Sequence, residues 1–271
     1  MFQPGDDLRA TATAAIADGA DAIGVAGGDG SQAVVAQIAS ERDIPYVCIP
    51  AGTRNHFAND LGVDRSDVVG ALDAFADGSE RRIDLARLNG RVFVNNSSLG
   101  VYAKIVQSER YRDAKMETVA RQLPELLPPR GGQFDLRFTA PDGTHWEGAH
   151  LVLVSNNPYR PPRLGTRGTR EGIDSGLLGV VAIRVLTPRR LAEIGATERT
   201  GAVPRPSGSL DFTAPAFTVD STGPVDVALD GEALVMEPPL RFESRASALR
   251  VRVMPPAHGA APPPRNIPTP F

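Results

Sequence analysis

The sequence predicts an α/β unit followed by an antiparallel β-sandwich unit, and three observations support this fold class. Over residues 1–83, short apolar segments alternate with segments of helical periodicity. Over residues 84–254, most segments alternate apolar and polar residues, which is typical of half-buried strands. A glycine-rich turn, Gly27-Gly28-Asp29-Gly30-Ser31, follows the first apolar segment and opens the next helix. Alternating strands and helices favour a parallel sheet with crossover helices in the first unit.

The first unit is expected to contain three helices and two strands. Helices are predicted where apolar residues share one face, at residues 6–19, 31–42 and 66–77. Ser66 is the expected N-cap of the third helix. Two short apolar runs predict buried strands, at residues 21–27 and 45–50. The single cysteine, Cys48, lies in the second strand, so we expect an inert core thiol and no internal disulfide.

The second unit is expected to consist mainly of antiparallel strands. Asn89-Gly90 is a strong signal for a hairpin turn within residues 81–100. Further strand candidates follow at residues 134–140, 145–156, 177–186, 209–220, 225–232, 239–244 and 248–254. One helix is predicted at residues 109–127, among these strands. The proline-rich residues 255–271 are expected to form a disordered tail.

The composition argues against several classes of protein. With a net charge of −3, the chain lacks the basic surface typical of nucleic-acid binding, so no nucleic-acid partner is expected. No apolar run approaches the roughly 20 residues of a transmembrane helix, so no such segment is predicted. The first residues lack the basic-then-apolar order of a signal peptide. The cytoplasm is therefore the expected compartment.

The turn at residues 27–31 has the properties of a phosphate-binding loop. Glycines let the backbone approach a ligand closely, and the amides at the start of the following helix point at an anion. Asp29 is a poor direct contact for phosphate because like charges repel, but its carboxylate suits a magnesium ion that accompanies phosphates. Taken alone, the same residues are equally compatible with a tight strand-to-helix turn that Asp29 caps.

A second loop follows the strand at residues 45–50 and is expected at the same end of the parallel sheet. Residues 49–63 read IPAGTRNHFANDLGV. Ligands of α/β sheets bind at the carboxyl ends of the strands, where these two loops would lie side by side. Gly52 and Thr53 open the turn, and Thr53 offers a hydroxyl and an amide to a phosphate. Asn55 offers a side-chain amide that bridges loop and substrate.

Together the two loops resemble the catalytic domain of the diacylglycerol kinase family, with the bacterial soluble lipid kinases closest in size. The second loop carries the distinctive pattern, Pro-x-Gly-Thr-x-Asn-x-Phe-Ala-x-x-Leu-Gly, over residues 50–62. The first loop is less specific, because NAD kinases and phosphofructokinases carry similar turns. Residues 81–100 and the late motif Asp230-Gly231-Glu232 also resemble family segments, so the resemblance covers residues 8–254.

The resemblance implies a reaction, its cofactors and its partner. The γ-phosphoryl group of ATP would move to a hydroxyl of diacylglycerol or a related lipid alcohol at a membrane surface, with Mg²⁺ as the metal ion. Asp29 would organise this ion. The residues implied in nucleotide binding are Gly27, Gly28, Asp29, Gly30, Ser31, Gly52, Thr53 and Asn55.

The resemblance also places the family's proton acceptor in the motif Asp230-Gly231-Glu232. Two carboxylates that straddle a glycine would lie on one side of an extended chain, about 7 Å apart. One would take the hydroxyl proton while the other assists with the metal or with hydrogen bonding. We favour Glu232 as the base and Asp230 as the second choice. Taken alone, the motif also fits a hairpin turn.

Four features depart from the family pattern. No Asn-Pro-x-Ser-Gly loop precedes residue 8, so we expect a nucleotide domain that lacks the family's first strand. Ser31 and Gln32 stand where Thr and Asn are usual. His56 replaces a common Asp, which changes the charge beside the expected cleft. Ser175 replaces an Asp of the structural Mg²⁺ site of soluble lipid kinases, which leaves Asp174 as a weaker candidate ligand.

Residues 159–171 are expected to form a basic loop. Four arginines lie in the proline- and glycine-rich residues 159–171: Arg160, Arg163, Arg167 and Arg170. Such a loop favours an anionic membrane surface and peripheral membrane association, although a solvated loop explains it as well.

The alternatives to an active lipid kinase are a catalytically weak or inactive lipid-binding relative and an NAD-kinase-like kinase for a small molecule.

Overall fold

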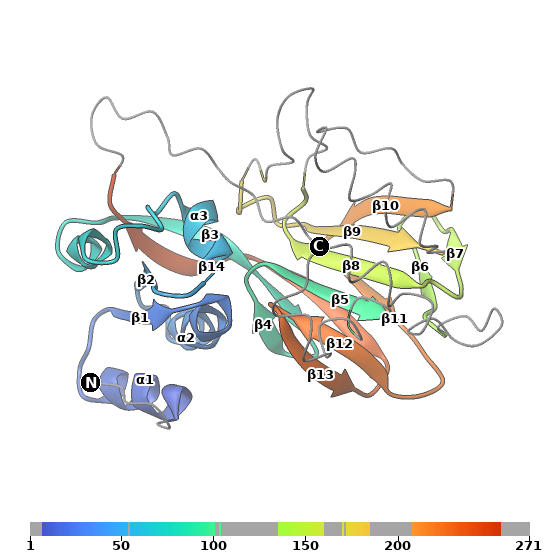
Figure 1. The fold of residues 1–271 in the computed structure, drawn as a ribbon, viewed down its shortest axis with the longest axis horizontal. Coiled ribbons are helices and arrows are strands. Elements are labelled where there is room, and N and C mark those ends of the chain that lie inside the picture. Colours follow the sequence, from blue (N-terminus) through green and yellow to red (C-terminus); the bar gives the residue numbers. More distant parts are fainter. Residues whose placement is uncertain are drawn as a thin grey trace.

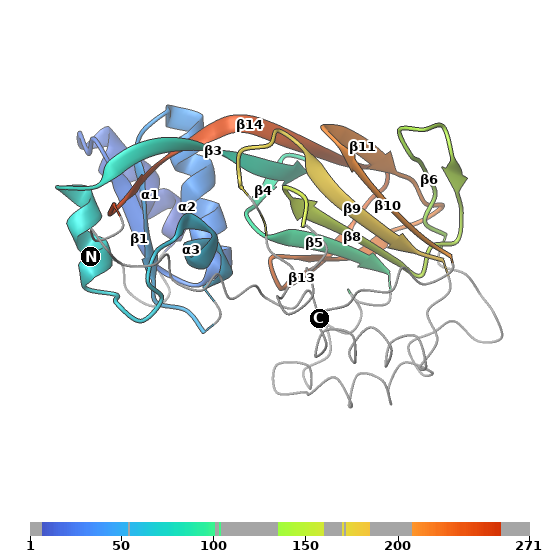
Figure 2. The ribbon, with the colours of Figure 1, turned by 90° about the horizontal axis from the view of Figure 1, so that it is seen from above.

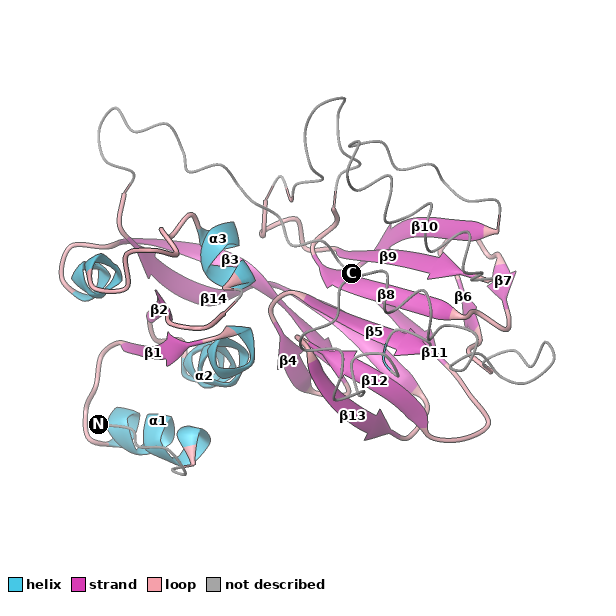
Figure 3. Cartoon of the chain, viewed as in Figure 1, coloured by secondary structure: helices cyan, strands magenta, loops and turns pink. Residues whose placement is uncertain are grey.

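Two long strands, β3 (Ser79–Leu88) and β14 (Leu240–Val253), run between the two halves of the molecule and join them (Figure 2). The computed structural model describes residues 7–53, 55–100, 103, 135–159, 170, 172–184 and 208–255. In this part of the chain the helices gather in one half, and the other half consists of strands (Figure 1 and Figure 3). The two strands pair antiparallel along almost their whole length, from Phe242 opposite Leu88 to Val253 opposite Ser79.

A mixed sheet with the strand order β1-β2-β14-β3-β4 begins in the helical half and extends into the other half (Figure 2). β1 (Ile23–Gly27) and β2 (Tyr46–Pro50) are parallel, as predicted, and the end of β14 is also parallel to β2. The helices are α1 (Leu8–Ala17), α2 (Asp29–Arg42), α3 (His56–Leu61) and the short 3₁₀ helix η1 (Gly70–Phe75). Apolar residues of α2 pack with Ile83, Leu249 and Val251 from the two long strands, so distant segments share one core.

The second half is a β-sandwich, which confirms the predicted fold class. One sheet has the order β10-β9-β8-β5-β12-β13, and the far ends of β3 and β14 with β4 and β11 form the facing layer. The strands are β4 (Arg91–Phe93), β5 (Asn96–Gly100), β6 (Phe138–Thr139), β7 (His145–Trp146), β8 (Leu151–Asn156), β9 (Leu178–Ile183), β10 (Ser209–Ala214), β11 (Ala216–Val219), β12 (Val225–Leu229) and β13 (Glu232–Met236). Aromatic rings fill the space between them, and Phe217 stacks on Phe242 with ring centroids 5.0 Å apart.

The helix predicted at residues 66–77 is wrong, because only η1 forms there. The hydroxyl of Ser66 bonds Asp64 Oδ1 at 2.6 Å instead of capping a helix, and Asp67 Oδ1 accepts the amide of Gly70. Two β-branched residues followed by a glycine, Val68-Val69-Gly70, disfavour a longer α-helix.

The two strands predicted at residues 239–244 and 248–254 are one strand, β14, with an irregularity in its pairing between Arg245 and Leu249. Ser247 has φ 53° there, and its amide donates to Asp84 Oδ1 at 2.8 Å. Asp84 is fully buried in β3, so a carboxylate of one strand holds the bulge of its neighbour.

Some predictions fall outside the described residues: the helix at 109–127, most of the tail at 255–271, and Arg160, Arg163 and Arg167. The division at residue 83 stays a prediction, although β3 crosses it without a break. Among the helices that the structure describes, none combines the length and apolar character needed to span a bilayer.

Candidate active site

The two predicted loops lie at the carboxyl ends of β1 and β2, and a buried glutamine joins them. Gln32 is 2% exposed in the first turns of α2. Its Nε2 donates to the carbonyls of Gly27 at 3.0 Å and Ile49 at 2.9 Å, and the hydroxyl of Tyr46 donates to its Oε1. Gln32 therefore fixes the ends of both strands with one side chain. The sequence signal was one polar residue on the otherwise apolar buried face of this helix.

The glycines of the two loops permit a close approach between the loops themselves. A Cβ on Gly52 would overlap the Cα of Gly28, so neither backbone could stay in place with a larger residue at position 52. Asn55 closes the second loop: its Oδ1 accepts the amide of Gly52 and its Nδ2 donates to the Gly52 carbonyl, both at 2.8 Å. With φ 51° and 7% exposure, Asn55 shapes the loop by these two bonds.

Asp29 connects the first loop to α3. Its Oδ1 accepts the amide of Phe57 at 3.0 Å, and its Oδ2 accepts the amide of His56 at 3.2 Å. These amides are among the first of α3 and have no partner within that helix. Asp29 thus caps a helix, as one sequence interpretation held, but the capped helix is the one after β2 rather than its own.

The other predicted nucleotide contacts lie around this junction. Gly28 is the N-cap of α2, with Asp29, Gly30 and Ser31 as its first three residues. A Cβ on Gly27 would come within 2.9 Å of the Ser31 Cβ, so the turn is tightly wound. Thr53 is exposed at the edge of the second loop, and His56 is partly buried at the start of α3.

The motif Asp230-Gly231-Glu232 is the turn between β12 and β13, not an extended chain. Asp230 has φ 47° and Gly231 has φ 89°, and Leu229 pairs with Glu232 across the turn. Two successive residues with positive φ match the turn that favours an Asp-Gly pair in hairpins. The expected extended geometry of the two carboxylates is therefore wrong, and the hairpin interpretation is correct for the backbone.

Asp230 holds a second turn of the chain. Its Oδ2 accepts the amide of Val94, and its Oδ1 accepts the amides of Asn95 and Asn96, at 2.8, 2.8 and 3.1 Å. Burial raises the pKa of Asp230 to about 7, and the negative charge of Asp29 adds to this, while the three amides oppose it. Asp29 and Asp230 are therefore close enough to influence each other electrostatically.

The hairpin brings Glu232 against the first loop. A Cβ on Gly30 would lie 2.9 Å from Glu232 Oε1, so the carboxylate occupies the space beside this glycine. Glu232 is itself exposed to solvent. The structure thus brings together Asp29, Gly30, Asp230 and Glu232, which come from opposite ends of the sequence.

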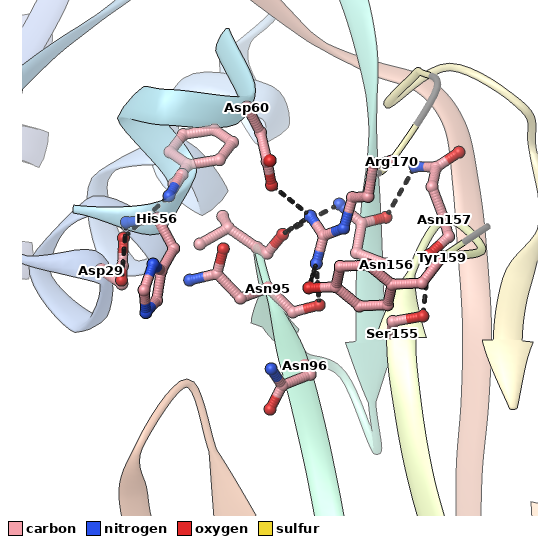
Figure 4. Close-up of polar contacts among 12 residues, drawn as sticks. Asp29, His56, Asp60, Asn95, Asn96, Ser155, Asn156, Asn157, Tyr159 and Arg170 are labelled. Atoms are coloured by element: carbon pink, nitrogen blue, oxygen red, sulfur yellow. Dashed lines mark hydrogen bonds and ion pairs between the residues drawn. The ribbon is translucent and has the colours of Figure 1, made fainter. Parts of the chain in front are cut away.

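Arg170 is buried in this neighbourhood rather than exposed on a basic loop (Figure 4). Its Nη1 bonds Asp60 Oδ2 at 2.7 Å, and its Nη2 donates to the Asn95 carbonyl at 2.6 Å. Burial opposes the charge of Arg170, but Tyr159, Asp60 and Asp230 outweigh it and hold the pKa of the guanidinium above its ordinary value. The expectation that Arg170 faces a membrane is therefore wrong, because its side chain is buried, paired with Asp60 and hydrogen-bonded to main-chain carbonyls.

Asp174 lies in a different setting from the first two loops. It lines a pocket of about 130 Å³ together with Arg81, Arg170 and Asp60. Ser175 uses its amide and hydroxyl to bond Asn157 Oδ1 at 2.8 and 2.6 Å. Two guanidinium groups disfavour a cation at Asp174, and no cluster of three His, Cys, Asp or Glu ligands occurs within the described ranges. A metal ion at Asp174 stays a prediction that its surroundings do not favour.

These features define a two-part protein in which two glycine loops of an α/β layer meet an acidic hairpin of a β-sandwich. The family described as Diacylglycerol kinase catalytic domain matches residues 2–88. A Pseudomonas aeruginosa protein named "Probable lipid kinase YegS-like" is 30% identical over 256 residues, which cover 91% of this chain and 81% of that protein. The chain therefore belongs to the diacylglycerol kinase catalytic-domain family, and the resemblance seen in its sequence is confirmed.

Two further comparisons agree with this assignment. The diacylglycerol kinase of Bacillus subtilis is 35% identical over 159 residues, which cover 55% of this chain and 50% of that protein. A crystal structure of a diacylglycerol kinase from Bacillus anthracis matches with a TM-score of 0.66 at 21% identity, covering 95% of this chain and 84% of that one. At this identity, the structural match shows a shared fold.

Proposed function

We propose that this protein is a lipid kinase that transfers the γ-phosphoryl group of ATP to a hydroxyl of diacylglycerol or a related lipid alcohol. Membership of the family supports the class of reaction. The observation that carries the assignment to this chain's own residues is the contact between Glu232 and Gly30, which puts a carboxylate beside the predicted phosphate loop. Phosphoryl transfer needs a positioned phosphate, compensation of its charge and a group that orients the attacking hydroxyl.

The start of α2 would bind the phosphates of ATP. A helix N-terminus offers amides without partners and a positive end of the helix dipole, both of which favour an anion. Gly28, Gly30 and Ser31 would contribute their amides, and Thr53 at the neighbouring loop would add a hydroxyl. Asn55 would act on the phosphate site through the shape of the second loop, since its side chain is bonded to Gly52 on both sides.

Glu232 is the proposed acceptor of the hydroxyl proton. It is exposed and next to the loop, so a lipid hydroxyl could reach its carboxylate. Asp230 has three main-chain amides on its oxygens and is better suited to hold the hairpin against residues 94–96. This division of roles keeps the sequence-based preference for Glu232 as the base.

Asp29 is the residue proposed to bind a magnesium ion at the loops. Asp29 lies on the loop proposed for the triphosphate, at the first position of α2, and Glu232 lies beside Gly30 of the same loop. Mg²⁺ in such sites is usually bound by one or two carboxylates together with the phosphates of the substrate. Asp29 would hold it together with the phosphates, and the bound ion would neutralise charge on the phosphates.

The test is transfer of ³²P from γ-labelled ATP into organic-extractable product, with vesicles of phosphatidylglycerol and diacylglycerol as the acceptor. Glu232→Gln should lower the rate by about 10²- to 10⁴-fold, the range of a general base. Glu237→Gln, an exposed glutamate at the end of the same hairpin, is the matched control and should keep the wild-type rate. Vesicle binding without transfer would point instead to a non-catalytic relative. In a parallel reaction with NAD as the acceptor, labelling of NAD without labelling of the lipid would point to a small-molecule kinase.

A further inference from the structure

Arg170 and Asp230 both form hydrogen bonds with the main chain of residues 94 and 95. Arg170 Nη1 and Nη2 donate to the carbonyls of Val94 and Asn95, at 3.3 and 2.6 Å. Asp230 accepts the amides of Val94 and Asn95, both at 2.8 Å. The peptide groups of residues 94 and 95 are thus held between a buried cation and a carboxylate. Both side chains therefore fix the position of this short segment.

Arg170 also reaches the opposite half of the molecule. Its Nη1 bonds Asp60 Oδ2 at 2.7 Å, and both side chains are nearly fully buried, at 2% and 5% exposure. Asp60 belongs to α3, whose first amides are bonded by Asp29. A continuous path of contacts therefore runs from Asp29 through α3, Asp60 and Arg170 to residues 94–95 and Asp230 (Figure 4 shows its central part).

The guanidinium is fixed in this position by geometry that no other side chain reproduces. Nη2 donates to the hydroxyl of Tyr159 at 2.9 Å, and the guanidinium carbon lies 4.7 Å from the centre of the Tyr159 ring. A planar group with several donors can serve a carboxylate, two carbonyls and a hydroxyl at once, whereas a lysine ammonium cannot. The ring of Tyr159 covers one face of the plane and limits its rotation.

We propose that Arg170 is a positioning residue, which sets the distance between Asp29 and the Asp230-Gly231-Glu232 hairpin by bonding α3 and residues 94–95 together. The inference rests on the proposed function, in which phosphate lies at the loop of Asp29 and the proton acceptor lies on the hairpin. Arg170 contacts neither reactant in this assignment. It acts by keeping the two halves of the site in register, and a small error in that register is costly for phosphoryl transfer.

The first test compares turnover in Arg170→Lys, Arg170→Met and Tyr159→Phe, with kcat and KM for ATP measured on diacylglycerol-containing vesicles. Misplacement by about 1 Å lowers rates by about 100-fold, so we expect kcat to fall by that order in Arg170→Met while KM for ATP changes little. Arg170→Lys should be faster than Arg170→Met but slower than the wild type, because lysine keeps the charge and lacks the planar set of donors of the guanidinium. Arg82→Met, which breaks an exposed ion pair with Asp43, is the control and should keep the wild-type kcat.

The second test needs no activity. Spin labels at Val69→Cys and Val235→Cys, two exposed positions in the two halves, report their separation by pulsed electron resonance in a Cys48→Ser background. The protein with intact Arg170 should give one narrow distance, and Arg170→Met and Tyr159→Phe should broaden it. If Arg170→Met fails to fold, Tyr159→Phe and Arg170→Lys decide the question.

The two tests separate the inference from the proposed function. Absence of phosphate transfer by the wild-type protein would contradict the proposed function, and the distance measurement would then decide on Arg170 alone. Wild-type kcat together with an unchanged narrow distance in the folded variants would overturn the positioning role. A lower melting temperature with unchanged kcat and distance would likewise reduce Arg170 to a purely structural residue.

Discussion

Glu232 and Gly30 are in direct contact: a Cβ on Gly30 would lie 2.9 Å from the Oε1 atom of Glu232. The two residues belong to the two halves of the molecule, one at the start of α2 and the other at the start of β13. Real Cβ atoms do not approach other atoms this closely, so position 30 tolerates no side chain unless Glu232 moves. A glycine is therefore needed at position 30 to leave room for the Glu232 side chain, as well as for the loop itself.

Gly30→Ala is expected to lower phosphate transfer with little effect on folding. The new methyl group would displace the flexible end of Glu232, which is exposed and can move without breaking the core. We expect kcat to fall by about 10- to 100-fold, as for other small misplacements of a reacting group. Gly223→Ala is the matched control, since a Cβ there meets nothing within 4 Å. Equal kcat values in the two variants would contradict this account of Glu232.

Asp29→Ala is expected to destabilise the protein and to remove activity, whereas Asp7→Ala should only destabilise it. Each carboxylate accepts two amides at the start of a helix. Asp29 accepts those of His56 and Phe57 in α3. Asp7 accepts those of Arg9 and Ala10 in α1, at 2.9 and 3.2 Å. Loss of such a cap costs about 0.5–2 kcal/mol. Urea unfolding should show similar losses in both variants, and the transfer assay should separate them. Wild-type turnover in Asp29→Ala would show that Asp29 only caps α3 and has no part in phosphate transfer.

Gly52→Ala is expected to destabilise the protein more than the loss of either cap. The added Cβ would overlap the backbone of Gly28, which cannot move aside as a flexible side chain can. The carbonyl of Gly27, next to it, is bonded by the buried Gln32, so a shift of the first loop would disturb that hydrogen bond as well. Thermal unfolding should show the loss, again with Gly223→Ala as the control. A melting temperature equal to that of the control would mean that the loops do not pack as closely as described.

The residues whose role is local were the ones that the sequence predicted well. Asn89-Gly90 was expected to form a hairpin turn, and both residues have positive φ, at 46° and 85°. The glycines at 30 and 52 were expected to let the backbone approach a ligand, which stays a prediction, and in the structure they permit close approaches to Glu232 and to Gly28. Buried Cys48 has its thiol pKa raised by burial and by Asp29, as expected of an inert core thiol. Turn chemistry and core patterning depend on neighbours in the sequence, so they can be read from it.

The residues that long-range contacts define could not be predicted. α3 was missed because it begins after a residue in the left-handed region, Asn55, and its cap comes from Asp29 in another loop. Arg170 looked like part of a basic surface loop, because nothing in its neighbourhood in sequence reveals Asp60 and the carbonyls of residues 94–95. The motif at Asp230 was expected to be extended, with a hairpin as the alternative, and it forms the hairpin. The bonds of Asp230 to three amides more than a hundred residues earlier depend on the packed sandwich.

The pKa of Asp230 predicts how stability depends on pH. Its value is raised from 3.8 to about 7 in the folded protein, mainly by burial. Between these values the folded protein binds a proton that the unfolded chain has released. The stabilisation from this group is therefore complete below about pH 4, falls as the pH rises towards 7 and is lost above it, with a slope of at most about 1.4 kcal/mol per pH unit.

Asp230→Asn has no such proton, and asparagine tolerates the positive φ of this position. Urea unfolding at intervals from pH 4 to pH 8 should thus show a wild-type advantage that shrinks with rising pH relative to Asp230→Asn, and a difference that stays constant over this range would contradict the raised pKa.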